Sequence, residues 1–521
     1  MLKSSGSMAL ATLISRLLGM VREMAYAAFM GDKWVAAAFQ VAFTIPNLFR
    51  RLLGEGALTA AFIPIFKEKE KTVGEKEMWR AANAVISGLV MASAVVVAVV
   101  LLGVTVALSV HEFEAKTELM LRLLRWMFPY MLLVCVAAAF MGMLNARGHF
   151  FIPAMGATML NIVMISSVLF LAPRWPGELH DKIFALAVGV LVAGVAQALF
   201  QVPTLWRDGF RLQWVTPWGN ETVARVVRQM IPGAIGVAAF QINVVIIQGL
   251  GLWLDTPQHP LIASYNYAVR LMELPQGLFG ISLATFLLPT LSGLATEKNW
   301  AEFRSTLRLG MEHVILVNLL MSVLLVTEAE SIIRLLFERG KFGPEATARA
   351  AWAVQCLGAS LVGYSLVNVL ARAFFATGDT RTPMKISMTC LALNLVFVLI
   401  LVWPFRQGGL GMANTITSGF NVALLLFALR KKLGRLELGR LRADLPALVV
   451  AAVIAVGISW WGGRYWEQTM GHGTLALKIG AVFVPGGVAC VAYWLVALGG
   501  RVPAAKELTE LVLRMFKGRQ S

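Results

Sequence analysis

Hydrophobic runs of about 20 residues recur along the whole chain, and short polar stretches separate them. A helix of this length crosses about 30 Å of hydrocarbon at 1.5 Å per residue. The alternating segments of about 10 residues that are typical of membrane β-barrels do not occur. The pattern therefore predicts an all-α polytopic membrane protein with about fourteen transmembrane helices, at residues 8–31, 34–65, 80–110, 120–146, 152–173, 182–206, 223–254, 261–292, 303–327, 346–376, 383–404, 408–431, 444–467 and 475–499.

The chain contains an internal repeat. LTAAFIPIF, with Pro64, matches LATFLLPTL, with Pro289, at a separation of 289 − 64 = 225 residues. NARGHFFIP, ending at Pro153, matches ATGDTRTP, ending at Pro383, at 383 − 153 = 230 residues. An even number of spans in each half keeps both halves in the same orientation. We therefore expect two parallel six-helix lobes, at 1–212 and 213–436, followed by two further spans and an amphipathic segment at 437–521.

Basic residues gather in alternate loops, which predicts the topology. The loop at 67–80 is rich in Lys, Arg and Glu, and the same side receives the basic run from Arg430 to Arg442. The positive-inside rule makes this side cytoplasmic and places both termini there. Beyond the last span, Leu508, Leu511, Val512 and Met515 share one helical face, which favours a short amphipathic helix on the membrane surface over a solvated tail.

Ionisable residues interrupt three of the predicted spans. Charged side chains at bilayer depth cost several kcal/mol each, so they are kept where they face a polar cavity, and there they usually mark a substrate path. In the second span, polar residues advance by three or four positions and form a stripe on one helical face. The candidates are Arg16, Arg22 and Glu23 in the first span, Asn47, Arg50, Arg51 and Glu55 in the second, and Arg270 and Glu273 in the eighth.

The charge of this set indicates an anionic substrate. Its five arginines and three glutamates leave a formal charge of 5 − 3 = +2. The planar guanidinium group binds phosphate or carboxylate in a bidentate manner, which favours those groups as ligands. Interhelical salt bridges or snorkelling to the membrane surface are the alternative for any single member.

Composition excludes several other functions. The chain is 58% hydrophobic and 14% charged, with a mean hydropathy of +0.72, so its net charge of +17 reflects membrane topology and attraction to anionic lipid rather than nucleic-acid binding. The four cysteines and six histidines show no metal-binding spacing, and no phosphate-binding loop occurs, so neither a metal nor ATP bound to this chain is expected. For Asn368 and Asn394, hydrogen bonding between helices is favoured over coordination of a coupling cation.

Four stretches resemble the MurJ/MviN family of lipid II flippases, within the multidrug/oligosaccharidyl-lipid/polysaccharide exporter superfamily. They are SRLLGMVRE, PNLFRRLLGEGALTAAFIPIF, YAVRLMELPQGLFGISLATFLLP and LLFERGKF. The resemblance implies fourteen helices, with the last two forming a groove for a lipid tail. It also implies transport of lipid II, an undecaprenyl-diphosphate-linked disaccharide-pentapeptide, across the bacterial inner membrane.

The resemblance also implies roles for individual residues. The essential arginines of the family match Arg16, Arg22, Arg50 and Arg270, and Arg51, Glu55 and Glu273 match their neighbours. The chain departs from the family pattern at two positions, where Ala37 and Val269 replace aspartates; Glu23 replaces a third. These changes make the expected cavity more cationic and question any gate built on aspartate–arginine pairs.

We therefore expect an alternating-access flippase in which the cavity arginines bind the diphosphate. No cofactor is expected, and coupling to the membrane potential or to a monovalent cation stays open. Proteins of cell-wall synthesis are candidate partners. The alternatives are an exporter of drugs or of another polyprenyl-diphosphate-linked oligosaccharide and, less favoured, an integral-membrane enzyme acting on polyprenyl phosphates.

Overall fold

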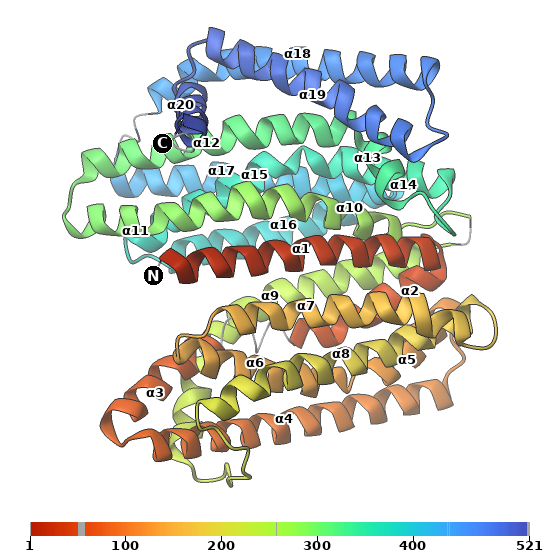
Figure 1. Ribbon diagram of the computed structural model, residues 1–521, viewed down its shortest axis with the longest axis vertical. Helices are drawn as coiled ribbons and strands as arrows, with labels where there is room; N and C mark the ends of the chain where they lie inside the picture. Colours follow the sequence, from red (N-terminus) through yellow and green to blue (C-terminus); the bar gives the residue numbers. More distant parts are fainter. Residues whose placement is uncertain (1, 50–57, 257, 435, 437, 518–521) are drawn as a thin grey trace. The chain divides into compact units, whose positions relative to one another are not determined.

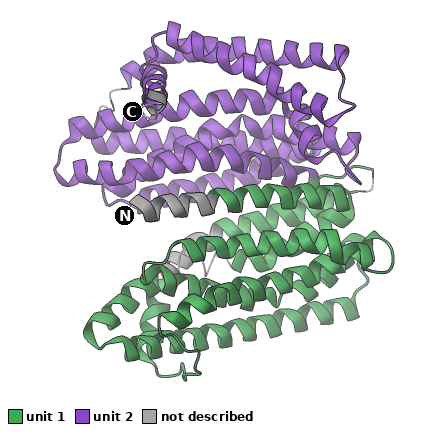
Figure 2. Cartoon of the chain, in the orientation of Figure 1, with its two compact units in different colours: residues 1–263 green, residues 264–521 purple. Residues whose placement is uncertain are grey.

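The computed structural model describes residues 2–49, 58–256, 258–434, 436 and 438–517, and the regular structure of these residues is helical throughout (Figure 1). The chain forms two compact units, residues 1–263 and 264–521 (Figure 2). The first unit contains α1 (Leu2–Met30), α2 (Trp34–Phe49), α3 (Leu58–Thr72), α4 (Glu75–Val110), α5 (Ala115–Met127), α6 (Tyr130–Ala146), α7 (Phe151–Ser166), α8 (Leu179–Arg207) and α9 (Glu221–Leu254).

The second unit begins within α10 (Ile262–Pro275). A π-helical segment, Gln276–Ile281, joins α10 to α11, because Pro275 interrupts the regular hydrogen bonding of the helix. The remaining helices are α11 (Ser282–Thr296), α12 (Trp300–Thr327), α13 (Ala329–Phe337), α14 (Pro344–Gly358), α15 (Ser360–Ala376), α16 (Arg381–Phe405), α17 (Gln407–Leu433), α18 (Gly439–Thr469), α19 (Leu475–Gly499) and α20 (Pro503–Lys517).

The helices agree with the predicted spans. Among the described residues, nine helices are long and apolar enough to cross a membrane, and eleven if each of two bent pairs is one span. The bent pairs are α5 with α6, at 44°, and α14 with α15, at 42°. The other predicted spans correspond to the charged helix α1, to α2 and α3 on either side of residues 50–57, and to α9, whose apolar part is 240–254.

The internal repeat is visible in the helix order. The first residues of α4 and α12 are 300 − 75 = 225 positions apart, and those of α6 and α15 are 360 − 130 = 230 positions apart. Equivalent helices also have equivalent neighbours, because α6 packs against α8 as α15 packs against α17. The offset grows where α4 continues unbroken to Val110, whereas its counterpart α12 stops at Thr327 and is followed by the short helix α13.

The packing boundary lies later in the chain than the predicted boundary between the lobes. The helix α9, which the sequence assigns to the second lobe, packs against α2, α3 and α4 in the first unit. The lobes are defined by the sequence repeat, whereas the units are defined by packing. The units therefore do not test the lobe boundaries, which stay a prediction.

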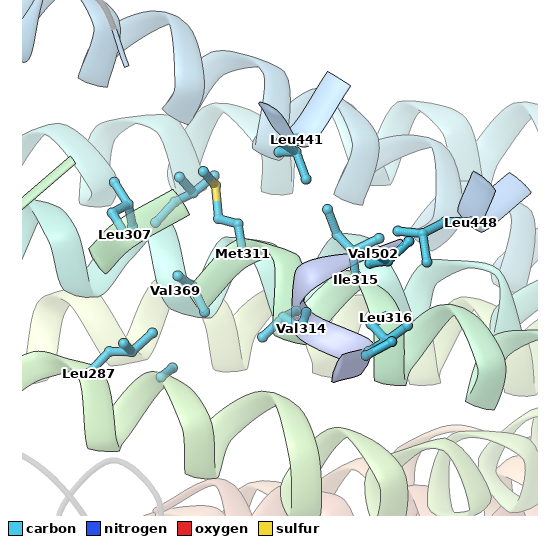
Figure 3. Close-up of a cluster of buried hydrophobic side chains, with 14 of the residues drawn as sticks. Leu287, Leu307, Met311, Val314, Ile315, Leu316, Val369, Leu441, Leu448 and Val502 are labelled. Atoms are coloured by element: carbon cyan, nitrogen blue, oxygen red, sulfur yellow. The ribbon is translucent and has the colours of Figure 1, made fainter. Parts of the chain in front are cut away.

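The predicted C-terminal segment is part of the second unit and packs against its helix α12. Leu441 and Leu448 from α18 and Val502, just before α20, join Met311 and Ile315 of α12 in one buried cluster (Figure 3). The Tyr493 hydroxyl of α19 donates a hydrogen bond to the Leu316 carbonyl at 2.9 Å.

The terminal amphipathic helix is present as α20. Its Leu508 packs against the cluster of Figure 3, and its Thr509 hydroxyl accepts a hydrogen bond from Trp494 Nε1 at 2.8 Å. Leu511, predicted on the same face, is 56% exposed. The segment is therefore a docked helix rather than a solvated tail.

Candidate functional site

In the first unit, Arg22 lies in a buried polar cluster on α1. The residue is 8% exposed, its Nη2 donates to Glu23 Oε1 at 2.6 Å, and its Nη1 donates to Asn161 Oδ1 at 3.1 Å. The guanidinium also lies over the ring of Tyr26, 5.5 Å from the centroid. These contacts fix the plane of the guanidinium, and Nε has no hydrogen-bond partner within the described ranges, which omit residues 50–57.

Asn161, on α7, is a site residue that sequence reasoning missed. Its Nδ2 donates to the Ser15 carbonyl at 3.0 Å, so that one amide joins Arg22 to the backbone of α1. Gly19 lies beside this contact, where a Cβ would be 3.8 Å from Asn161 Nδ2, an ordinary van der Waals distance. Arg16, half-buried, lies on the same stretch of α1.

The stripe predicted for the second span is only partly described. In α2, Gln40 and Asn47 are half-buried, and the Thr44 hydroxyl donates to the Gln40 carbonyl at 2.8 Å. Three of the predicted cavity residues, Arg50, Arg51 and Glu55, lie outside the described residues.

In the second unit, Arg270 and Glu273 form the predicted pair on α10. Arg270 Nη1 lies 2.8 Å from Glu273 Oε2, and the two side chains are 34% and 43% exposed. The pair lies one turn before the π-helical segment that follows Pro275. Arg270 is thus more accessible to water than Arg22.

A second polar network missed from the sequence starts on α10. Asn414 Nδ2, on α17, donates to the Tyr265 hydroxyl at 2.7 Å, and Asn414 Oδ1 accepts from the Tyr364 hydroxyl at 2.8 Å. Asn394, on α16, donates to Asn414 Oδ1 at 3.3 Å. Asn394 therefore takes part in the favoured hydrogen bonding between helices, whereas Asn368 donates to the Tyr364 carbonyl of its own helix.

Charged residues outside the spans hold helix ends together in the first unit. Arg147 pairs with Glu70 and Glu75 and lies over the ring of Trp79. Arg225, at the start of α9, binds Glu68, at the end of α3, through two hydrogen bonds of 2.8 and 2.7 Å. The hydrogen bond from Arg225 lowers the pKa of the Glu68 carboxyl, so this pair stays charged at neutral pH.

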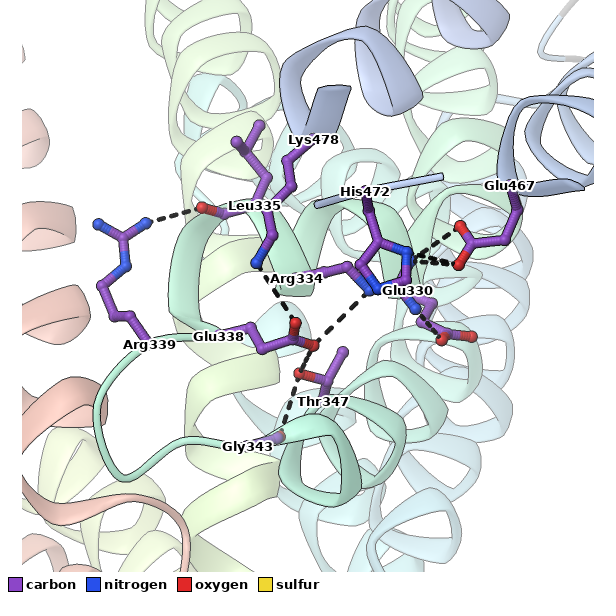
Figure 4. A network of polar contacts seen from close by, with 10 residues as sticks. All are labelled: Glu330, Arg334, Leu335, Glu338, Arg339, Gly343, Thr347, Glu467, His472 and Lys478. Carbon is purple, nitrogen blue, oxygen red and sulfur yellow. Dashed lines mark hydrogen bonds and ion pairs between the residues drawn. The ribbon is translucent and has the colours of Figure 1, made fainter. Parts of the chain in front are cut away.

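In the second unit, a charged network joins α13 to the hairpin of α18 and α19 (Figure 4). Arg334 lies 2.6 Å from Glu330 and 3.0 Å from Glu467, and its side chain is 11% exposed. Glu338 accepts hydrogen bonds from Lys478 of α19 and from the Thr347 hydroxyl. The extra helix α13 therefore acts as a docking point for the C-terminal hairpin.

The chain is similar to known transport proteins over most of its length. A family model described as lipid II flippase MurJ matches residues 26–480. A "Probable lipid II flippase MurJ" of Haemophilus influenzae is 30% identical over 473 residues, which cover 86% of this chain and 90% of that protein. A "Lipid II flippase MurJ" of Burkholderia cenocepacia is 32% identical over 460 residues, covering 86% and 88%.

A solved structure has a similar fold. The "Lipid II flippase MurJ, inward closed conformation" superposes with a TM-score of 0.75 at 19% identity, and the match covers 94% of this chain and 98% of that one.

Proposed function

The chain belongs to the MurJ family of lipid II flippases, and on this basis we propose that it moves lipid II across the membrane by alternating access, with the arginines predicted from the sequence binding the diphosphate. The environment of the other parts of lipid II during transport follows from their polarity. The sugar–peptide head group stays in water, whereas the polyprenyl tail stays in lipid. The apolar outer faces of α18 and α19, where Trp461, Phe483 and Leu495 are more than 60% exposed, are suited to contact with such a tail.

The single observation that carries the role of the arginines is the environment of Arg22. Burying a guanidinium group to 8% exposure within a membrane helix costs free energy. Charged residues that are kept in such positions usually mark a functional site. Asn161 and Glu23 hold the guanidinium group in one orientation, and its Nε has no acceptor among the residues that the structure describes. A phosphate oxygen is the acceptor that a fixed guanidinium edge suits best. Arg16, Arg50 and Arg270 are proposed to contribute the remaining positive charge, with Asn47, Arg51 and Glu55 as supporting residues.

The replacement of two acids by Ala37 and Val269 changes how the empty site balances its charge. Ala37 is fully buried in α2 and carries no group that could pair with an arginine. Instead, Arg22 pairs with Glu23 and Arg270 pairs with Glu273, each within its own unit. We propose that these internal pairs neutralise Arg22 and Arg270 between transport cycles and exchange with the diphosphate when lipid II binds, while the other arginines keep the empty site cationic.

The proposal also includes the side of the membrane on which the termini lie and the source of energy for transport. Both termini are placed in the cytoplasm of a bacterial cell, because the basic loops follow the positive-inside rule. An inside-negative potential, worth about 2.3 kcal/mol per charge for each 100 mV, favours return of an empty cationic site toward the cytoplasm. Cell-wall synthesis proteins stay candidate partners on functional grounds.

Complementation of a flippase-deficient strain tests the role of the arginines. Arg270→Ala and Arg22→Lys are expected to abolish growth while the protein still accumulates in the membrane, since lysine keeps the charge and loses the planar fork. Arg122→Ala is the matched control, because Arg122 is 56% exposed and pairs with Glu118 of its own helix. Normal growth of both site variants would reject the diphosphate site.

A further inference from the structure

Asp255, directly after α9, is a buried carboxyl group that the proposed transport mechanism does not use. It is 1% exposed, and its Oδ1 accepts a hydrogen bond from the Leu261 amide at 3.1 Å. Its Oδ2 is buried and has no hydrogen-bond partner in the part of the chain that the structure describes. A buried carboxylate oxygen without a donor is costly when ionised, whereas a protonated carboxyl group carries no net charge to bury.

The charges around Asp255 come from two other segments and from its own loop. Lys116 Nζ, on α5, donates hydrogen bonds to the carbonyls of Trp253 and Asp255, at 2.9 and 2.7 Å. The same ammonium group lies 3.4 Å from the Glu114 carboxylate. Asp32, in the turn between α1 and α2, is 2% exposed and acts on Asp255 as a like charge. His259, exposed on the same loop as Asp255, is the other titratable group.

These surroundings place the titration of Asp255 in the physiological range. Burial raises the pKa of the Asp255 carboxyl to about 7; the hydrogen bonds from the Leu261 and Ile262 amides and the charge of Lys116 oppose the rise, and Asp32 adds to it. The carboxyl group thus changes its charge near neutral pH, in a buried position where ionisation costs free energy.

The position of Asp255 in the chain connects it to transport. The hydrogen bond to Leu261 closes the loop that leads into α10, and the second unit begins at Ser264 within that helix. Arg270 and Glu273 lie two to three turns further along α10. A change in this loop therefore acts on the segment that carries the site residues of the second unit.

We propose that Asp255 is a proton-binding site whose protonation holds the contact between Asp255 and Leu261 closed and whose ionisation releases it, so that flipping responds to the proton concentration on the side opposite the termini. This inference rests on the proposed flippase function. The state in which this contact is closed binds the proton more tightly than the open state, in which a hydrated aspartate has its ordinary pKa near 4. Closure is therefore favoured at low pH, weakens as the pH rises from about 4 to about 7, and changes no further above that range.

Fluorescent lipid II flipping by the full chain in liposomes, measured at several external pH values, tests this site. The wild-type rate is expected to change at least about threefold between pH 5.5 and 8, and Asp255→Asn is expected to flip lipid II without this dependence. Glu118→Gln, which removes an exposed acid on α5, is the matched control and should keep the wild-type profile. An unchanged pH profile in Asp255→Asn would overturn the proposal.

Two further variants separate a proton site from a structural role. Asp32→Asn removes the like charge and should move the pH midpoint down, whereas Lys116→Gln removes the attractive charge and should move it up. Shifts of equal sign, or none, would contradict the assignment. Flipping that is absent at every pH in the wild type would instead reject the proposed function itself.

Hydrogen exchange of the unmodified protein keeps the proposal testable if Asp255→Asn does not fold. Protection of the Leu261 and Ile262 amides, corrected for the intrinsic exchange rate, should fall between pH 5 and 8. Protection that is constant over this range would overturn the proposal.

Discussion

Arg22 donates a hydrogen bond from Nη1 to Oδ1 of Asn161 over 3.1 Å, although the two residues are 139 positions apart in the chain. The amide of Asn161 is in turn held by the Ser15 carbonyl. Asn161 therefore positions the guanidinium group and is not itself required to touch the substrate.

Asn161→Leu should weaken lipid II binding about tenfold, because a buried charge-assisted hydrogen bond contributes about 1.5–3 kcal/mol. Binding to the purified protein can be followed by native mass spectrometry, with thermal unfolding as the check on folding. Asn368→Leu is the control, since Asn368 bonds only to the Tyr364 carbonyl of its own helix among the contacts that the structure describes. Unchanged affinity in Asn161→Leu would remove Asn161 from the site.

Arg334→Gln should loosen the C-terminal hairpin. The substitution leaves Glu330, Glu338 and Glu467 without their shared cation, at an expected cost of about 1 kcal/mol in the free energy of unfolding, because two of the three acids are exposed and Glu338 keeps Lys478. Hydrogen exchange at residues 464–478 should rise. Arg339→Gln is the control, because Arg339 is exposed and bonds to the Leu335 carbonyl of its own helix. Equal exchange in the two variants would show that the network of Figure 4 does not hold the hairpin.

The buried carboxyl group of Glu328 should make stability depend on pH. Burial raises its pKa from 4.5 to about 7, while the Ser459 hydroxyl, which donates to Oε1 at 2.6 Å, opposes the rise. The folded state binds the proton more tightly than the unfolded state, so stability falls as the pH rises from about 4.5 to about 7 and is level above.

Glu328→Gln should remove this share of the dependence, up to about 3 kcal/mol, in thermal unfolding at pH 5 and pH 8. Ser459→Ala should enlarge it, because the opposing hydrogen bond is lost. The Glu328 assignment fails if both variants retain the wild-type difference between the two pH values.

Gly409→Ala should destabilise the protein by about 1–3 kcal/mol. A Cβ at Gly409 would collide with the Leu401 carbonyl, which is backbone and cannot move aside. Gly419→Ala, in the same helix α17, meets no atom within 4 Å and should be neutral or slightly stabilising. Similar unfolding temperatures for the two variants would contradict the close approach of α16 and α17 at this point.

Hydropathy was sufficient to predict most of the helices, because about 20 apolar residues define a membrane span without reference to tertiary contacts. The repeat was visible in the sequence because both halves keep the same turn residues. The G-x-x-x-x-P pattern places Gly148 and Gly378 at turns where both have positive φ, at 90° and 76°, and such a turn favours glycine.

Contacts between helices could not be predicted in this way. The spacing of Arg16, Arg22 and Glu23 identifies one face of α1 but not the residue that α7 brings to it, so Asn161 was missed. The bends before Tyr130 and at Ala359, and the separation of α13 from α12, depend on packing that leaves the hydrophobic pattern unchanged. Arg50, Arg51 and Glu55 remain predictions from the sequence.

The most direct test is the leaflet accessibility of lipid II in cells depleted of their own flippase and then resupplied with this chain. Lipid II should become accessible from outside the membrane when the wild-type chain is produced, and should stay inaccessible with Arg270→Ala at equal membrane levels. Accessibility that is restored equally by both would contradict an arginine-bound diphosphate. If neither restores it, the chain does not flip lipid II.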